Sequence, residues 1–345
     1  MKYLFSLIEF NEFRPIIKSS SLNLFNSYNW LFTLYKTYQF PTIILHERIN
    51  NIYIPFCIIK NNFEATINCL PFSDYVLEGV NEEFIEQSII YLNKNYPDFQ
   101  ISIKAIMNNL VDLCPASIPL IRTPIGITYQ IHLKQQRNHI SKNAPYYRNI
   151  RKAVQNGISV GSSTSIKSLR DFYNLHLNLR VQKFKKIPQP YSFFQNLHDI
   201  FIRQNKGFIY EAKLDNIVIA AWIILIEDNK LYYKYAASTA EQLIYRPNDL
   251  LYKSLVEYGT SHSFDLLDLG LSGIGPAYDG LLRFKKKEMG SESRIYKYSF
   301  TPTAYHNKIY RSKAEFINKR IETSVSNHDT DSVQTLSNKL YHLFS

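Results

Sequence analysis

Three apolar runs joined by two short turns constrain the fold of this chain more than any other feature of its sequence. The runs cover residues 207–214, 217–226 and 230–237, and the pairs Asp215-Asn216 and Asp228-Asn229 separate them. Asp and Asn favour tight turns because their side chains hydrogen-bond to the nearby backbone and because they tolerate the left-handed conformation. The pattern therefore predicts three antiparallel strands in consecutive order.

Helical patterns surround this meander. The expected elements are helices at 166–184, 192–204 and 250–263, and strands at 264–269 and 294–300. The last of the three helices can be capped by Asn248 or Asp249. This order of elements predicts an α/β (α+β) domain: two helices, the meander, a helix, a strand, a short helix or loop, and a final strand.

The first 160 residues alternate in a similar way. Expected there are helices at 22–37, 81–96 and 146–156, a hairpin over 42–60, and strands at 66–70, 100–106 and 125–133. We therefore expect two domains, 1–160 and 161–303, of ordinary size for a chain of 345 residues. The segment 304–345 is expected to form a helical tail that packs on the rest or makes an oligomer contact.

Composition narrows the class of protein. Hydrophobic residues make up 45% of the chain, which is enough for real cores, and no apolar run reaches the 18 residues of a membrane span. Glu9 and Glu12 interrupt the only segment that could act as a signal peptide, so we expect a cytoplasmic protein. The three cysteines and nine histidines have no spacing typical of metal ligands, and we expect no metal.

The net charge of +11 is unevenly distributed. Between Asp112 and Asp171 there is no acidic residue, whereas nine lysines and arginines occur there, including Arg148 and Arg151. A field of one sign attracts polyanions such as a nucleotide diphosphate, the phosphates of tRNA or the headgroups of an anionic membrane. The alternative is a soluble protein that is basic throughout.

The segment 264–290 combines a broken strand with clustered cations. The strand at 264–269 stops at Gly270, a glycine-containing loop follows, and a strand is expected to resume at 281–284 before Lys285, Lys286 and Lys287. Such an arrangement suits a developing oxyanion or a phosphate. The alternative is a core strand followed by solvated lysines.

Five segments in the same order resemble the Fem-type peptidoglycan aminoacyl transferases and related GNAT-superfamily acyltransferases of envelope polysaccharide biosynthesis. They are LPFSDY at 70–75, YRNIRKA at 147–153, Arg180 and Lys183 with PQPYSFF at 188–194, RPNDLL at 246–251, and LDLG at 267–270 with GLLRFK at 280–285. The resemblance covers roughly residues 20–300.

The resemblance implies tandem GNAT-like domains with central mixed sheets, and an acceptor bound largely by the first domain. It also implies that the lysine of the Phe-Lys motif lies near the reacting carbonyl. This chain departs from the family pattern in two ways. Lys285 follows Phe284, but Lys286 has the family's spacing of four residues before Gly290, and residues 245–250 lack the Gly-x-Gly/Ala loop that grips CoA in ordinary GNAT enzymes.

The candidate catalytic residues are Lys285 or Lys286, as the cation at the oxyanion, and Asp268, which could orient the amine, act as a base or simply cap the broken strand. The candidate substrate-binding residues are Asp74, Tyr75, Arg148, Arg151, Arg180, Lys183, Arg246, Asn248 and Ser272. For the charged members of this set, a surface or turn position is the competing interpretation.

These observations predict an N-acyltransferase that acylates an amino group of an anionic nucleotide- or lipid-linked envelope precursor. Direct attack is expected because no serine or cysteine lies in a nucleophile-elbow motif. The donor co-substrate would be an acyl thioester such as acyl-CoA, or alternatively aminoacyl-tRNA, with no bound cofactor. Peripheral membrane association fits the charge. The alternative to an enzyme is a non-catalytic module that binds a glycan or nucleotide precursor.

Overall fold

The computed structural model describes residues 2–10, 23–60, 65–70, 72–107, 117–134, 145–184, 186–286, 290–302 and 333. The expected C-terminal helices lie outside these residues, apart from the isolated Val333. None of the described helices is long and apolar enough to cross a bilayer.

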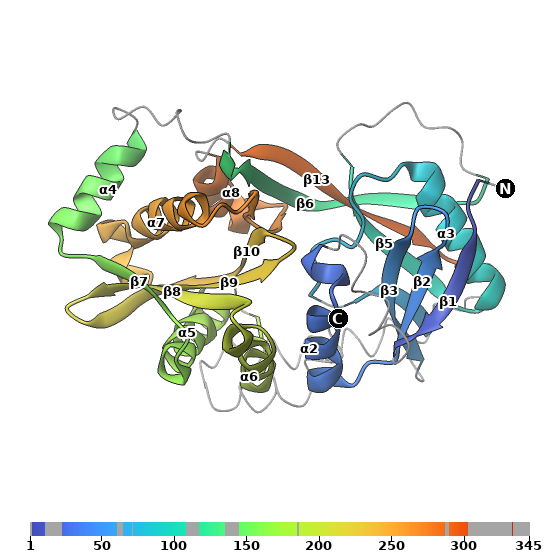
Figure 1. Cartoon of the computed structure of the whole chain (residues 1–345), viewed down its shortest axis with the longest axis horizontal. Coiled ribbons are helices and arrows are strands. Elements are labelled where there is room, and N and C mark those ends of the chain that lie inside the picture. Colours follow the sequence, from blue (N-terminus) through green and yellow to red (C-terminus); the bar gives the residue numbers. More distant parts are fainter. Residues whose placement is uncertain are drawn as a thin grey trace.

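All strands of the described residues belong to one mixed sheet (Figure 1). Its order is β1-β2-β3-β4-β5-β13-β6-β11-β10-β9-β8-β7, and the short β12 pairs with β6 beside this path. The first five strands are β1 (Phe5–Glu9), β2 (Thr42–Glu47), β3 (Ile52–Lys60), β4 (Ala65–Cys69) and β5 (Gln100–Ile106). The parallel β4–β5 pair is connected through α3 (Glu82–Asn95), whose expected cap Asn81 accepts a hydrogen bond from the backbone of Phe84.

The predicted meander is confirmed. It consists of β8 (Gly207–Leu214), β9 (Ile217–Glu227) and β10 (Lys230–Ser238), and β7 (Ser159–Ser163) extends it at the edge. Both residues of each Asp-Asn turn have φ between 48° and 64°. Two consecutive residues in the left-handed region define the turn that suits a twisted hairpin, and Asp and Asn are among the few residues that adopt it readily.

Two long strands join the halves of the chain. β6 (Ile121–His132) and β13 (Ser291–Phe300) run side by side across the middle of the molecule, as Figure 1 shows. β13 also pairs with β5, and β6 also pairs with β11 (Leu266–Asp268), so each half contributes a strand next to the other. We propose that residues 1–160 and 161–303 are two domains of similar topology that share these strands.

Helices cover both faces of the second half. α5 (Ile166–Asn178) and α6 (Tyr191–Ile200) lie on one face, and α2 (Tyr28–Tyr38) packs against α6. α4 (Pro145–Gln155), α7 (Pro247–Ser261) and α8 (Asp279–Lys286) lie on the other face, where they share one hydrophobic cluster (Figure 1).

Two local expectations were wrong. Residues 281–284 are not a strand but part of α8, which follows a single turn at Pro276–Tyr278 and begins with an acidic residue that suits a helix N-terminus. The cap of α7 is Arg246 rather than Asn248 or Asp249, because Pro247 occupies the first helical position, where a missing N–H group costs nothing.

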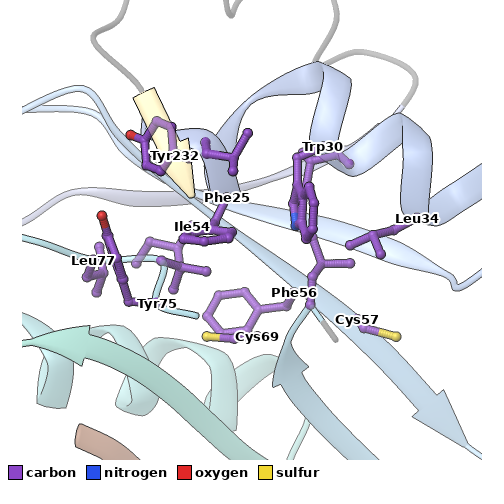
Figure 2. Close-up of a cluster of buried hydrophobic side chains, with 14 of the residues drawn as sticks. Phe25, Trp30, Leu34, Ile54, Phe56, Cys57, Cys69, Tyr75, Leu77 and Tyr232 are labelled. Carbon is purple, nitrogen blue, oxygen red and sulfur yellow. The ribbon is translucent and has the colours of Figure 1, made fainter. Parts of the chain in front are cut away.

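An aromatic core connects the two halves. Figure 2 shows Phe25, Trp30, Phe56 and Tyr75 of the first half together with Tyr232 of β10. The rings of Phe25 and Tyr232 have centroids 6.2 Å apart at an interplanar angle of 73°, a favourable edge-to-face contact. The indole Nε1 of Trp30 donates to Oγ of Ser73 at 2.9 Å. This core therefore holds the segment around Ser73 against the second half.

Candidate functional site

The central strands of the second half separate at one point. β10 and β11 are parallel neighbours only from Lys230–Leu266 to Tyr232–Asp268. Beyond that point the register of β10 shifts between Tyr233 and Tyr235, so that Lys234 is the extra residue of a β-bulge. Such a bulge re-aims a side chain, and bulges are frequent next to active sites. The chain after β11 turns away at Gly270, which has a φ of 69°.

The carboxylate of Asp268 lies at this point and is almost fully buried. Its Oδ1 accepts from Thr128 Oγ1 at 2.8 Å and from the backbone N of Gly270 at 2.7 Å. Its Oδ2 accepts from Tyr75 Oη at 2.8 Å and from Gln130 Nε2 at 3.3 Å. A carboxylate offers about four acceptor positions, so these donors satisfy it. The geometry favours a role in fixing the end of β11.

Asp74 links the two halves through a largely buried ion pair. Its Oδ1 lies 2.6 Å from Nζ of Lys234, and its Oδ2 accepts from the backbone N of Leu271 at 3.1 Å. Nζ of Lys234 also donates to the carbonyl of Phe72 at 2.8 Å. Two donors leave part of the acceptor capacity of Asp74 open, in contrast to Asp268.

Lys234 was missed at the sequence level. Its ammonium lies 4.7, 5.1 and 5.5 Å from the ring centroids of Phe25, Trp30 and Tyr235. Cation–π attraction of this kind stabilises a desolvated ammonium. The sequence contains one clue, because Lys234 interrupts an otherwise apolar strand. A lysine at an exposed position of that strand would explain the pattern equally well, and the sequence does not reveal the bulge.

Of the two candidate lysines, Lys285 points into this network and Lys286 is exposed. Nζ of Lys285 donates to the carbonyl of Gly270 at 2.8 Å and lies 5.5 Å from the ring centroid of Tyr233. Its other hydrogens have no acceptor among the described residues. The pKa of Lys285 is lowered from 10.5 to about 8, mainly by burial; the carboxylates of Asp74 and Asp268 oppose this shift, and the neighbouring ammonium of Lys234 adds to it.

Tyr75 and Ser272 complete the set of predicted residues in this region. Burial, and to a lesser degree the neighbouring Asp268, raises the pKa of Tyr75 well above its usual value, so its hydroxyl remains a donor. Ser272, on β12 (Ser272–Gly273), is fully buried, and its Oγ has no hydrogen-bond partner among the described residues.

The other predicted residues lie on different elements. Arg148 and Arg151 are exposed on α4, and Arg246 is exposed at the start of α7. Arg180 and Lys183 belong to a π-helical turn, Leu179–Lys183, and both lie over the ring of Phe184. Oδ1 of Asn248 accepts from Nε1 of Trp222 at 3.1 Å, which is a structural contact.

The N-terminus of α7 carries a buried acid. Oδ1 of Asp249 accepts from Nδ2 of Asn149 on α4 at 2.9 Å, and Asp249 is only 6% exposed. The positive end of a helix dipole ordinarily attracts an anion. Here the chain's own carboxylate lies in that first turn, and Pro247 removes one N–H group.

Residues 141–286 match the family model described as an acetyltransferase (GNAT) domain. The chain has the GNAT fold. Among solved structures, FemX is similar over 88% of this chain and 98% of that chain, with a TM-score of 0.58 and 14% identity. The structure of L-PGS from Bacillus licheniformis is similar over 85% of this chain and 92% of that chain, with a TM-score of 0.56 and 13% identity.

A third similar structure is the C-terminal domain of a putative lysylphosphatidylglycerol synthetase from Agrobacterium fabrum. It covers 84% of this chain and 91% of that domain, with a TM-score of 0.56 and 11% identity. No curated protein sequence matches the chain. At these identities the likeness concerns the fold. The resemblance to Fem-type transferases and their GNAT relatives that the motifs predicted is confirmed.

Proposed function

We propose that the protein is an N-acyltransferase that acylates an amino group, on an amino sugar or a peptide, of an anionic cell-envelope precursor. The observation that carries the proposal is the state of Lys285. It is a buried ammonium whose one acceptor among the described residues is the carbonyl of Gly270, at the point where β10 and β11 separate. Buried charges normally have their hydrogen-bonding capacity filled, so spare donors here suggest a substrate oxygen as the missing partner.

In this proposal the ammonium of Lys285 stabilises the oxyanion that forms when the amine attacks the donor carbonyl. The amine nitrogen bonds to the carbonyl carbon, and the bond from that carbon to the donor's oxygen or sulfur breaks. One proton of the amine leaves with the departing group, so the reaction is balanced without another reagent. With a pKa of about 8, Lys285 is about nine-tenths protonated at pH 7.

Asp74 is the better candidate than Asp268 for holding the attacking amine. Asp268 already accepts four hydrogen bonds, whereas Asp74 accepts from Lys234 and Leu271 and is 13% exposed at its side chain. An amine N–H can use an open acceptor position on Asp74, and this contact would orient the nitrogen lone pair toward the carbonyl. Asp268 and Tyr75 would then act as positioning residues.

The start of α7 does not fit the diphosphate of CoA gripped in the ordinary way. The buried carboxylate of Asp249 lies in the first turn, and the helix lacks the N–H group of Pro247. A negative charge at this place opposes an incoming diphosphate. This observation favours the second donor, aminoacyl-tRNA, over acyl-CoA. The name of lysylphosphatidylglycerol synthetase, a structural neighbour, also refers to an aminoacyl product. Charged tRNA implies reaction in the cytoplasm.

The test is mass spectrometry of an amine acceptor library incubated with acyl-CoAs or with charged tRNA, with and without RNase. We expect a product that depends on Lys285 and is lost after RNase treatment. Lys286→Met is the matched control, because this exposed neighbour should leave turnover unchanged. Equal turnover by Lys285→Met and wild type would refute the assigned role. Precursor binding without transfer from any donor would instead identify a non-catalytic binding module.

A further inference from the structure

Phe72 has a backbone conformation that its own side chain disfavours. Its φ is 63°, in the left-handed region, where the Cβ of a bulky residue crowds the backbone. Ten non-glycine residues of the described part of the chain have a positive φ; six of them are Asn or Asp, and Phe72 is the only apolar one. Strain of this kind persists where the surrounding structure over-determines the conformation, and it is concentrated at functional sites.

Packing of the ring holds Phe72 in this conformation. Its ring centroid lies 5.3 Å from that of Tyr38 on α2 and 6.0 Å from that of Phe193 on α6. The side chain also packs against a small buried cluster that consists of Leu177, Val181, Ile187 and Val333. Val333 is fully buried there, so a residue from the C-terminal segment belongs to the support of the ring.

The backbone that follows Phe72 is tied to other elements by its polar groups. Nζ of Lys234 on β10 donates to the carbonyl of Phe72 at 2.8 Å and lies 2.6 Å from Oδ1 of Asp74. Nζ of Lys104 on β5 donates to the carbonyl of Ser73 at 3.1 Å. One ammonium therefore joins the strained residue to the carboxylate two positions later.

We propose that Phe72 is a positioning residue that holds Asp74 and Lys234 at the attacking amine, a proposal that rests on the acyl transfer argued above. A relaxed backbone at Phe72 would redirect the chain after it, and the carbonyl of Phe72 and the carboxylate of Asp74 would no longer meet the same ammonium. A displacement of about 1 Å at a reacting group can lower the rate by about a hundredfold. The strained conformation thus sets the place of the carboxylate that receives the amine.

The competing interpretation is a turn that needs only a left-handed residue. Glycine adopts that conformation without strain, so under this interpretation Phe72→Gly would be neutral or stabilising. Under our proposal the ring immobilises the segment, and Phe72→Gly releases it. The two interpretations therefore predict opposite effects of the same substitution on the geometry of Asp74.

The first measurement is NMR of ¹³Cε-labelled lysine in the full chain without substrate. Asp74 has the largest effect of the charged groups on the pKa of Lys285, and it raises that pKa. Release of the segment in Phe72→Gly should therefore lower the pKa of Lys285, in the same direction as Asp74→Asn. Phe72→Leu, which keeps an apolar side chain, should cause a smaller shift of the same sign.

Phe40→Leu is the matched control. The ring of Phe40 also lies 5.3 Å from that of Tyr38, but Phe40 makes none of the contacts that hold Asp74. Phe40→Leu should lower stability in urea unfolding and leave the pKa of Lys285 unchanged. Val333→Ala opens the supporting cluster without altering Phe72 itself, and it should lower the pKa of Lys285 even if Phe72→Gly does not fold.

The second measurement is steady-state transfer to the amine acceptor that the library screen identifies. In Phe72→Gly, kcat/KM for the acceptor should fall by about tenfold to a hundredfold, while KM for the donor stays the same. An unchanged or higher pKa of Lys285 in both Phe72→Leu and Val333→Ala would overturn the proposal. So would an equal shift in Phe40→Leu, since the effect would then follow from any loss of aromatic packing.

Failure of the positioning role and failure of the proposed function are distinguishable, because the NMR measurement needs no substrate. A lowered pKa of Lys285 in variants of a protein that transfers nothing would support the coupling of Phe72 to Asp74 and overturn the acyl transfer. Transfer that depends on Lys285 but is equally fast in Phe72→Gly would overturn the positioning role and leave acyl transfer intact.

Discussion

Replacing Lys285 by methionine should lower activity and raise stability at neutral pH. Burial lowers the pKa of Lys285 from 10.5 to about 8. At about 1.4 kcal/mol per pH unit, this shift means that the charged form of Lys285 destabilises the folded protein by about 3 kcal/mol. Methionine removes that cost. It also leaves the carbonyl of Gly270 without its donor, which costs about 1 kcal/mol. The net gain at pH 7 is therefore about 2 kcal/mol.

The stability that Lys285→Met gains over wild type depends on pH in a defined direction. The pKa of Lys285 is lower in the folded than in the unfolded state, so the unfolded state binds more protons between pH 8 and 10.5, and wild-type stability rises through this window. Above that window the amine is neutral in both states, and the variant should be about 1 kcal/mol less stable because only the lost hydrogen bond remains. The stability difference between the two proteins should thus change sign.

The assay is urea unfolding of wild type, Lys285→Met and Lys286→Met at several pH values from 7 to 10.5, alongside turnover of each protein. Loss of an oxyanion donor should reduce kcat of Lys285→Met by roughly 10²–10³-fold. Lys286→Met should resemble wild type in both measurements, because its side chain is exposed. A Lys285→Met protein that is less stable than wild type at pH 7, or a difference that does not vary with pH, would refute the reasoning.

Three further predictions concern the same region and its surroundings. Lys234→Met should raise the pKa of Lys285 and Asp74→Asn should lower it, as measured by NMR of ¹³Cε-labelled lysine; shifts in the same direction would contradict the network. Tyr75→Phe removes a hydrogen bond to a buried carboxylate and should cost about 1.5–3 kcal/mol in urea unfolding, whereas no loss would show that the contact is dispensable. Burial lowers the pKa of His176 from 6.5 to about 3, so wild type should lose about 2 kcal/mol between pH 6.5 and 5, and His176→Phe should not share this loss.

Local sequence patterns predicted the elements whose cause is local. The Asp-Asn turns define the meander because few other residues adopt two consecutive left-handed conformations, and Asn81 marks the start of α3 because its side chain caps the helix. The strand expected at 281–284 was wrong because four mostly apolar residues fit a strand or one face of a short helix equally well.

The choice between Lys285 and Lys286 could not be made from sequence for the same reason. Adjacent residues on a helix differ by about 100° in direction, and only the packing of α8 on the sheet decides which of them is buried. The pairing of β13 with β5 was equally invisible, since the two strands are separated by almost two hundred residues and no local pattern specifies such a pairing.

Four of the predicted site residues, Asp74, Tyr75, Asp268 and Lys285, lie together because the two halves complete each other's hydrogen bonds. Three of the four donors to Asp268, namely Tyr75, Thr128 and Gln130, come from the first half of the chain. In a second half folded alone, that buried carboxylate would keep only the backbone N–H of Gly270, and an unsatisfied buried charge is strongly destabilising. Assembly of the site should therefore depend on folding of both halves.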